Sequence, residues 1–298
     1  MKKLGFFCLA VVAVCVFASC DKGDLGVFKP KMKISSIYNE TNGHYLQEKW
    51  TWGDDRLEQV DYYRKSGNVD YSHVYQYEKN HLSSIVMDNT HTDFVYDGKK
   101  LTNIYTYEGD QMIESYALTY NKNKLSHISL SKKTDKNVVY DDELVLKYLF
   151  PTDDPAPAAC LYGQKEEKER YDFSAAEIDF VWEEDNVKYM KMKINRPDSI
   201  QKLTYTFMYD QNVNPKMNFF SLLVDHMMIS DKPQSPFCSS NNVLTVYVTD
   251  ESDFNSQTHS YTYSYDYYKK YPTKVYSTTF NQQTFVRDST LLYSYQYQ

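Results

Sequence analysis

Apolar and polar residues alternate along much of the chain, and the apolar positions are unusually often aromatic. Residues 116–120 read YALTY, residues 203–209 read LTYTFMY, residues 261–265 read YTYSY and residues 293–297 read YSYQY. A period of two puts the aromatic side chains on one face of a β-strand and the Thr, Ser and Gln side chains on the other. One buried and one solvated face is typical of antiparallel sheet. The pattern therefore predicts an all-β, mainly antiparallel protein.

A short unit, FVYDGKKLTNIY at residues 94–105, recurs along this pattern. An aromatic residue is followed by four mostly polar residues, then by an aliphatic residue, and then by another apolar residue three positions later. Each copy predicts a strand, a tight turn and a return strand, because the polar residues are those that accept turn conformations. The two apolar residues three positions apart predict a β-bulge at the start of the return strand. The five copies are Trp52/Leu57/Val60, Tyr77/Leu82/Ile85, Tyr96/Leu101/Ile104, Tyr120/Leu125/Ile128 and Trp182/Val187/Met190.

Within the 94–105 copy, Asp97 and Gly98 are expected in the turn, Tyr96 and Leu101 at the inward ends of two strands, and Lys99 and Lys100 in solvent. The spacing between copies is irregular, so the array is expected to be a meander of hairpins that forms a curved sheet or an open, barrel-like array, not a solenoid.

One β-rich repeat-hairpin domain is expected over 35–298, with a possible joint at 150–160, where the sequence reads FPTDDPAPAAC. Proline excludes central strand there. The apolar run in 214–229 places several apolar residues on one helical face, which predicts one short helix near 216–229.

The N-terminus indicates export. Lys2 and Lys3 precede an uncharged apolar run, Leu4 to Phe17, that is too short at about 21 Å to cross a bilayer core of about 30 Å. Residues 1–19 are therefore expected to be a signal peptide. The segment that ends at Cys20 resembles a bacterial lipobox, which implies a thioether-linked diacylglycerol and an acylated amino group on Cys20. The resemblance implies a protein held in the cell envelope, on the outer membrane, by its lipid, with 20–34 as a tether.

The charge of the chain argues against one class of partner. Loss of Lys2 and Lys3 with the signal would lower the net charge from −7 to about −9. A phosphate backbone would be repelled, so no nucleic-acid partner is expected.

Two cysteines remain after signal removal and lipidation, Cys160 and Cys238. An oxidising compartment permits a disulfide between them. Two separate buried thiols are the alternative, because two cysteines carry no spacing signature.

The sequence holds few catalytic signals. It contains no Gly-x-Ser-x-Gly elbow, no glycine-rich phosphate loop and no His-Glu-x-x-His. We therefore expect no catalytic residue, no metal site and no cofactor. A carboxylate-based glycan hydrolase is an alternative motivated by the 40 acidic residues. A scaffold whose edge strands pair with other chains is another.

The aromatic residues suggest binding instead. Tyrosine and tryptophan offer flat amphipathic surface that loses little side-chain entropy on contact. The candidate ligand-binding residues are Trp50, Trp52, Tyr265, Tyr267 and Tyr268. The function expected from these observations is a non-enzymatic binding module that uses an aromatic sheet surface for a glycan, peptide or protein.

The hairpin units resemble those of an uncharacterised lipoprotein family of Bacteroides and its relatives, with degenerate YD repeats like those of Rhs shells. The resemblance rests on FVYDGKKLTNIY, YTFMYDQNVNP and YTYSYDYYKKYPTKVY, with Asn214-Pro215, Asn241 to Val243 and Tyr271 to Lys274 as further detail. It implies a secreted, lipid-anchored, β-rich protein and no particular activity.

Overall fold

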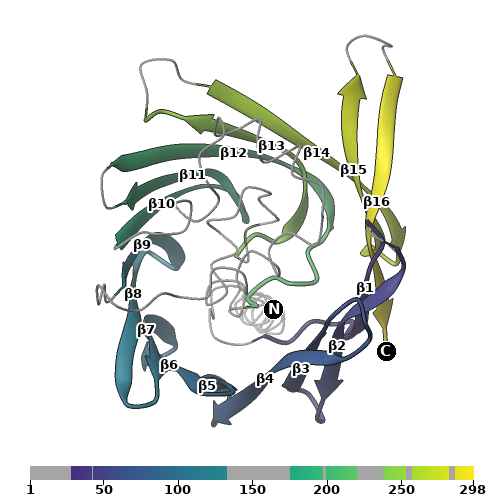
Figure 1. The fold of residues 1–298 in the computed structure, drawn as a ribbon. Coiled ribbons are helices and arrows are strands. Elements are labelled where there is room, and N and C mark those ends of the chain that lie inside the picture. Colours follow the sequence, from purple (N-terminus) through teal and green to yellow (C-terminus); the bar gives the residue numbers. More distant parts are fainter. Residues whose placement is uncertain are drawn as a thin grey trace, which may run out of the picture.

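The chain folds into one closed barrel of sixteen antiparallel strands (Figure 1). The computed structural model describes residues 28–41, 43–132, 175–196, 199–219, 236, 238–252, 257–281 and 286–298. The strands follow one another around the barrel in chain order, as the colours of Figure 1 show.

The strands are β1 (Ile34–Asn39), β2 (Tyr45–Trp52), β3 (Leu57–Tyr63), β4 (Val69–Glu78), β5 (His81–Met87), β6 (Thr90–Asp97), β7 (Lys100–Glu108), β8 (Gln111–Asn121), β9 (Lys124–Lys132), β10 (Ala175–Glu183), β11 (Asn186–Asn195), β12 (Ile200–Val213), β13 (Asn241–Asp250), β14 (Gln257–Tyr268), β15 (Tyr271–Asn281) and β16 (Val286–Tyr297). The predicted all-β antiparallel class is confirmed.

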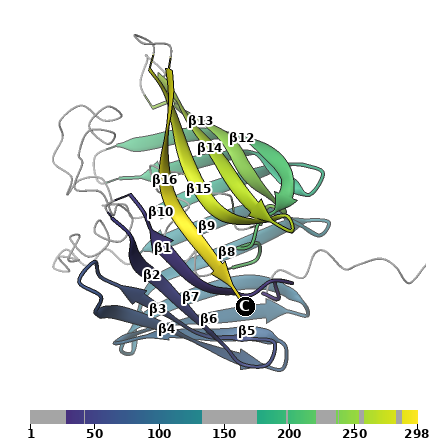
Figure 2. The ribbon, with the colours of Figure 1, turned by 90° about the vertical axis from the view of Figure 1, so that its right-hand side faces the viewer.

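The barrel closes where the first strand meets the last. β1 pairs with β16 from Ile34 opposite Tyr297 to Asn39 opposite Tyr293, and Figure 2 shows the two strands side by side. The expectation of a curved sheet or an open array was wrong on this point. A closed barrel leaves no strand edge unpaired, and closure joins residues that are too far apart in sequence for a local hairpin signal to reveal.

The predicted bulges are confirmed in all five copies of the recurring unit. In the 94–105 copy, Val95 faces Asn103 and Tyr96 faces Leu101, so Thr102 is the extra residue. The structure adds three further bulges of the same form, with extra residues Ser35, Leu244 and Thr273. The barrel therefore consists of eight bulged strand pairs, seven formed by consecutive strands and the eighth by β16 and β1 where the barrel closes. We call them the hairpin units, and each odd-numbered strand carries one anchor residue among its first three residues. These anchors are Ile34, Leu57, Leu82, Leu101, Leu125, Val187, Val243 and Pro272.

An aromatic side chain on each even-numbered strand bonds to the anchor of the preceding unit. Each donates its O–H or indole N–H to the anchor's main-chain carbonyl at 2.6–2.9 Å. Because a bulge disrupts the strand ladder locally, these donors satisfy polar groups beside the irregularity. The eight pairs are Trp52–Ile34, Tyr77–Leu57, Tyr96–Leu82, Tyr120–Leu101, Trp182–Leu125, Tyr209–Val187, Tyr265–Val243 and Tyr297–Pro272.

Removing one of these hydroxyls should destabilise the protein. Tyr120→Phe deletes the bond of 2.7 Å to the Leu101 carbonyl, and we expect the free energy of unfolding to fall by about 1–2 kcal/mol. Tyr105→Phe, at a half-buried position on the outer wall, is the matched control and should change it by less than about 0.5 kcal/mol. Urea denaturation measures both, and equal effects of the two substitutions would contradict a bonding role for the Tyr120 hydroxyl.

The turns at this end of the barrel are closed by cations. Lys100 donates to the Lys122 carbonyl at 3.0 Å and lies 5.7 Å from the ring centre of Tyr120. Lys33, Arg56 and Lys124 occupy the same position before an anchor, and each also donates to a carbonyl in the next turn of the barrel. Lys100 is exposed, as expected, and its long side chain in addition spans two hairpins.

The Gly98 turn position has a left-handed backbone. Gly98 has a φ of 60°, as predicted for a turn residue, and Lys79, Lys122 and Glu184 adopt φ values of 56°, 58° and 50° at the equivalent position. Glycine adopts this conformation without steric penalty, whereas the other copies hold it with larger residues.

Inward-facing and outward-facing positions differ sharply in polarity. The inward residues of most strands are apolar and buried, and they form one hydrophobic cluster. The outward positions between them carry charged and hydroxyl side chains: on β11, Lys191 and Lys193 alternate with buried Met190, Met192 and Ile194. The barrel is therefore mainly apolar inside and mainly polar outside, although a few inward residues such as Glu48 and Glu114 are charged and a few outward ones such as Val95 and Val181 are apolar.

Four sequence expectations fall partly or wholly outside the described residues. The helix near 216–229 is described only to residue 219; residues 215–218 form turns, and none of the described residues is helical. The possible joint at 150–160 and the signal segment 1–19 lie outside the described residues. The tether is described from Phe28, which is 8% exposed and contacts Trp50 and Phe219.

Candidate functional site

A row of polar and aromatic side chains crosses the inner wall where the barrel closes. Tyr295 of β16 faces Ile37 of β1, Ile37 faces Glu48 of β2, and Glu48 faces Tyr62 of β3. Cross-strand partners share one face of a sheet, so these side chains lie on the inside with Ile37, which is 2% exposed.

Glu48 forms a buried ion pair with a residue from a distant part of the chain. Its Oε1 lies 3.3 Å from Lys216 Nζ, and its Oε2 accepts a bond of 2.8 Å from the Trp50 indole N–H. The Lys216 ammonium lies 5.8 Å from the Trp50 ring centre. Both side chains are at most about a tenth exposed. A buried charge is tolerated only with such a partner, so each residue depends on the other.

The β12–β13 connection delivers Lys216 to this place. The Asn214 side chain donates to the Ser239 carbonyl at 3.0 Å and accepts from the Lys216 N–H at 3.0 Å. Phe219, 2% exposed, packs 4.6 Å from the ring centre of Trp50. The Asn-Pro pair of the sequence therefore shapes the loop that carries the lysine.

The inner face of β14 and β16 is the less enclosed part of the wall. On both strands the inward tyrosines are half-buried, whereas inward Leu125 and Ile128 on β9 are completely buried. Burial raises the pKa of Tyr293 and Tyr295 above the usual range, and the nearby Glu48 carboxylate adds to the rise at Tyr295. Both hydroxyls therefore keep their protons at neutral pH.

Tyr293 and Tyr295 differ from the aromatic donors of the hairpin units. Within the part of the chain that the structure describes, neither hydroxyl makes a hydrogen bond, whereas the neighbouring Tyr297 donates to the Pro272 carbonyl at 2.7 Å. We call Glu48, Lys216, Tyr293 and Tyr295 the seam cluster. It offers aromatic faces, two free hydroxyls, a carboxylate and an ammonium group.

The five candidates named from the sequence lie in several places. Trp50 and Trp52 do share the inner face, stacked 6.1 Å apart, but Trp50 is only 3% exposed. Tyr265 is half-buried and donates to the Val243 carbonyl, and the Tyr267 hydroxyl donates to Asp210. Only Tyr268, at 54%, is largely exposed. The structure thus brings Trp50 beside the seam cluster and places Tyr268 elsewhere, at a turn.

Sequence reasoning missed all four members of the seam cluster. Tyr293 and Tyr295 belong to a strand pattern that was recognised, but the pattern does not distinguish tyrosines whose hydroxyl is hydrogen-bonded from those whose hydroxyl is not. Glu48 is two residues before Trp50 on the same strand, so its side chain points to the same face, and this spacing could have identified it. Nothing in the sequence connects Lys216 to residue 48.

The cysteine predictions remain open in part. Cys238 is a free thiol, 3% exposed, and burial raises its pKa to about 12. Cys160 and Cys20 lie outside the described residues, so the disulfide and the lipid attachment stay predictions.

A buried histidine lies two strands from the seam cluster. His73 on β4 is 1% exposed, contacts Tyr62, Tyr71 and Tyr75, and has its Nε2 3.3 Å from Met87 Sδ. Burial lowers the pKa of His73 from 6.5 to about 4, because the charged ring would lose its hydration.

His73 should make stability depend on pH. The unfolded chain binds a proton at about 6.5 and the folded chain at about 4, so stability is complete above pH 6.5 and falls by roughly 3 kcal/mol as the pH drops to 4. His73→Leu should remove this component. Urea unfolding of both proteins between pH 4 and pH 7.5 gives the difference, and a difference that does not change with pH would contradict the burial effect.

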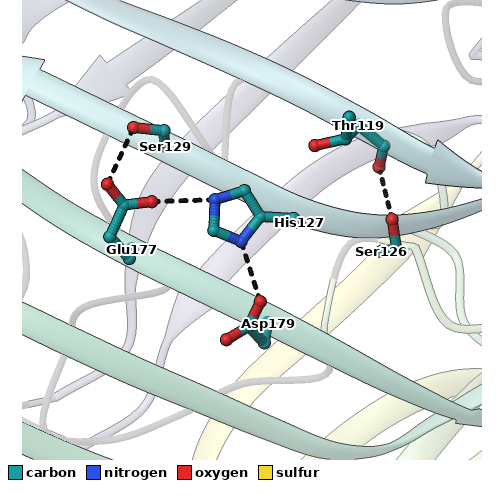
Figure 3. A network of polar contacts seen from close by, with 6 residues as sticks. All are labelled: Thr119, Ser126, His127, Ser129, Glu177 and Asp179. Carbon is teal, nitrogen blue, oxygen red and sulfur yellow. Dashed lines mark hydrogen bonds and ion pairs between the residues drawn. The ribbon is translucent and has the colours of Figure 1, made fainter.

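A second polar cluster lies on the outer wall (Figure 3). His127 Nε2 lies 2.8 Å from Glu177, and its Nδ1 lies 2.8 Å from Asp179, across the β9–β10 pair. Ser129 donates to Glu177 at 3.0 Å. Because both ring nitrogens already face carboxylates and the side chains are a third or more exposed, this cluster stabilises the strand pair modestly.

The described ranges lack two features that the sequence left open. The described ranges contain no group of three or more His, Cys, Asp or Glu side chains placed to hold a metal ion. They also contain no helix of the length and apolarity that a membrane crossing requires.

Similarity to known proteins is confined to the fold. No protein-family model matches the sequence, and no curated protein matches it. The fold is similar to that of a porin-like protein from Bacteroides vulgatus ATCC 8482, with a TM-score of 0.51 and 9% identity over 90% of this chain and 99% of that one. A porin-like protein from Bacteroides uniformis ATCC 8492 gives a TM-score of 0.47 and 11% identity over 89% and 98% of the two chains.

Proposed function

We propose that this chain is a lipid-anchored protein of the cell envelope whose barrel faces water and which acts by binding a ligand. The observation that carries the proposal is the polarity of the barrel wall, which is mostly apolar inside and, on strands such as β11, carries charged side chains outside. The membrane anchor in this proposal is the lipid predicted on Cys20.

The wall has the opposite polarity to that of a membrane-spanning barrel, whose outer band is apolar and whose interior is polar. Lys191 is exposed in the middle of β11, and Lys193 of β11 and Lys202 of β12 are exposed opposite each other nearer the strand ends. A lysine at the centre of a bilayer would cost about 2–4 kcal/mol, and less nearer the interface. The similarity to porin-like proteins therefore describes the fold of this chain, and we do not propose that it forms a pore.

Binding is favoured over the two alternatives by particular contacts. The described inner-wall glutamates Glu48 and Glu114 each pair with a lysine, at 3.3 Å in both cases, so neither is poised opposite a second carboxylate for hydrolysis. An edge-pairing scaffold loses its basis because every strand has two neighbours. The half-buried hydroxyls of Tyr293 and Tyr295, which make no hydrogen bond to a described residue, are available for contact with a ligand.

Detergent phase partitioning tests the anchor and the water-facing wall together. The chain matured in a bacterium that processes lipoproteins should enter the detergent-rich phase. A Cys20→Ser chain, exported with an ordinary secretory leader in place of residues 1–19, should stay in the aqueous phase, folded and monodisperse.

The opposite partitioning would remove the proposal. If the Cys20→Ser chain still entered the detergent phase while folded, the barrel wall itself would be binding amphiphile. If the matured chain with Cys20 stayed in the aqueous phase, the lipid would be absent.

A further inference from the structure

The two unbonded hydroxyls of the seam cluster call for a partner. Tyrosine hydroxyls enclosed by protein usually find a hydrogen-bond partner, and all eight aromatic donors of the hairpin units do so. Tyr293 and Tyr295 are half-buried on the same inner wall and make no such bond to a described residue. A free donor on a partly enclosed wall is available to a ligand.

We propose that the seam cluster is a subsite for a neutral sugar residue, with Tyr293 and Tyr295 bonding to its hydroxyls. This inference rests on the proposed binding function and names the class of ligand. It is carried by the placement of four side chains. Glu48 of β2 and Lys216 of the β12–β13 connection lie 3.3 Å apart. Tyr295 and Tyr293 of β16 lie opposite Ile37 and Asn39 of β1, and both charges act on the Tyr293 hydroxyl.

The charges of the cluster favour a neutral ligand. Glu48 and Lys216 neutralise each other at 3.3 Å, so the site offers no net charge for a carboxylate or phosphate to neutralise. The ammonium makes one described bond and retains donor capacity, whereas the carboxylate accepts from both Lys216 and Trp50. A sugar hydroxyl both donates and accepts, and therefore suits such a mixed set of groups.

The surrounding aromatic residues suit the apolar face of a sugar ring. The inward tyrosines of the adjoining strand β14, Tyr261 and Tyr263, are half-buried and pack against the core cluster. Sites for small ligands combine such flat hydrophobic lining with a few placed polar groups. The inner wall of β14 and β16 provides the lining, and the seam cluster provides the polar groups.

Isothermal titration calorimetry of the mature full chain tests the proposal. The probes are the neutral hexasaccharides of maltose, cellulose, xylan and mannan type, with oligogalacturonate as an anionic comparison. The protein is kept in a detergent without a sugar headgroup, because a glycoside detergent would compete. We expect at least one neutral probe to bind and the anionic probe to bind more weakly.

The decisive variant removes only the two hydroxyls. Tyr293→Phe with Tyr295→Phe should raise Kd about tenfold or more, since it deletes two hydrogen bonds to the ligand. The matched control, Tyr189→Phe with Tyr247→Phe, changes two outer-wall tyrosines in one cross-strand row and should leave Kd within about twofold. Melting curves of both double variants verify that they fold.

Hydroxyl-radical footprinting, which does not require an ionised phenol, provides a readout in the unmodified protein. A bound neutral hexasaccharide should slow oxidation of Tyr293 and Tyr295, measured by peptide mass spectrometry, but not that of Tyr247.

Several results would overturn the subsite. These are no binding of any neutral probe at about 10 mM, tighter binding of the anionic probe, no protection of Tyr293 and Tyr295, or an unchanged Kd in the inner double variant. The last result, with binding intact, would leave the proposed binding function standing and move its site elsewhere.

Discussion

Lys216→Met is expected to lower the free energy of unfolding by about 3–5 kcal/mol, the largest effect of any single substitution in the seam cluster. The side chain is 11% exposed and its ammonium is 3.3 Å from Glu48. Methionine keeps most of the volume and the contact with Trp50 but leaves the Glu48 carboxylate buried without its cation. The decrease in the free energy of unfolding therefore measures the cost of burying the Glu48 carboxylate without its cation. Urea denaturation at pH 7 gives this decrease.

The double variant separates charge from packing. Glu48→Gln with Lys216→Met removes both charges and retains an acceptor for the Trp50 indole, so it should recover at least about half of the loss. Lys191→Met on the outer wall is the control and should change stability by less than about 0.5 kcal/mol. If the double variant were as unstable as the sum of the two single variants, the pair would not be coupled in the folded protein.

Leu125→Ala is expected to lower the free energy of unfolding by about 2–5 kcal/mol, because it opens a cavity in a closely packed core. Leu125 is completely buried, and its carbonyl accepts the Trp182 indole N–H at 2.6 Å. The carbonyl belongs to the main chain and stays in place, so the substitution tests the side-chain packing of the anchor alone.

The repeat makes a stricter prediction from the same experiment. Leu57→Ala and Leu101→Ala alter equivalent anchors that are 1% and 0% exposed, and each should cost about as much as Leu125→Ala, within roughly 1.5 kcal/mol. The outward substitution Ser131→Ala is the control and should be nearly neutral. A cost below about 1 kcal/mol at all three anchors would show that the anchors do not form the core.

The local structure was predictable from the sequence because it is set by near neighbours. The spacing from Tyr96 to Leu101 and Ile104 predicts the turn, the bulge and the inward direction of these side chains, and the structure confirms all three. Of the three further units, the one at Pro272 was missed because proline stands where the five predicted copies have an aliphatic residue, although Val275 follows three positions later as usual.

Closure and the candidate site were not predictable because they depend on distant contacts. β1 meets β16 through residues at opposite ends of the described chain, such as Ile34 and Tyr297. Glu48 and Lys216 are brought together by the path of a connection and not by strand periodicity. The hydrogen bond of the exposed Lys100 side chain was not predictable because its acceptor, the Lys122 carbonyl, belongs to the next hairpin.

The recurring unit therefore has a structural role that explains its residue types. The aromatic residue bonds to the previous bulge, and the anchor itself fills the core. In four units a lysine or arginine before the anchor also bonds to the next turn. Ligand contacts are expected where this pattern leaves groups unbonded, as at Tyr293 and Tyr295.

Lysine acylation with a membrane-impermeant reagent tests the central claim most directly. The lipidated chain is bound to the outside of phospholipid vesicles, and modification of the outer-wall lysines Lys49, Lys191, Lys193 and Lys202 is compared with that of the Cys20→Ser chain free in buffer. A water-facing barrel held by its lipid predicts the same extent and rate of labelling in both samples. Protection of these four lysines on vesicles, with turn lysines such as Lys79 still labelled, would show that the wall lies in the bilayer and would contradict the proposed function.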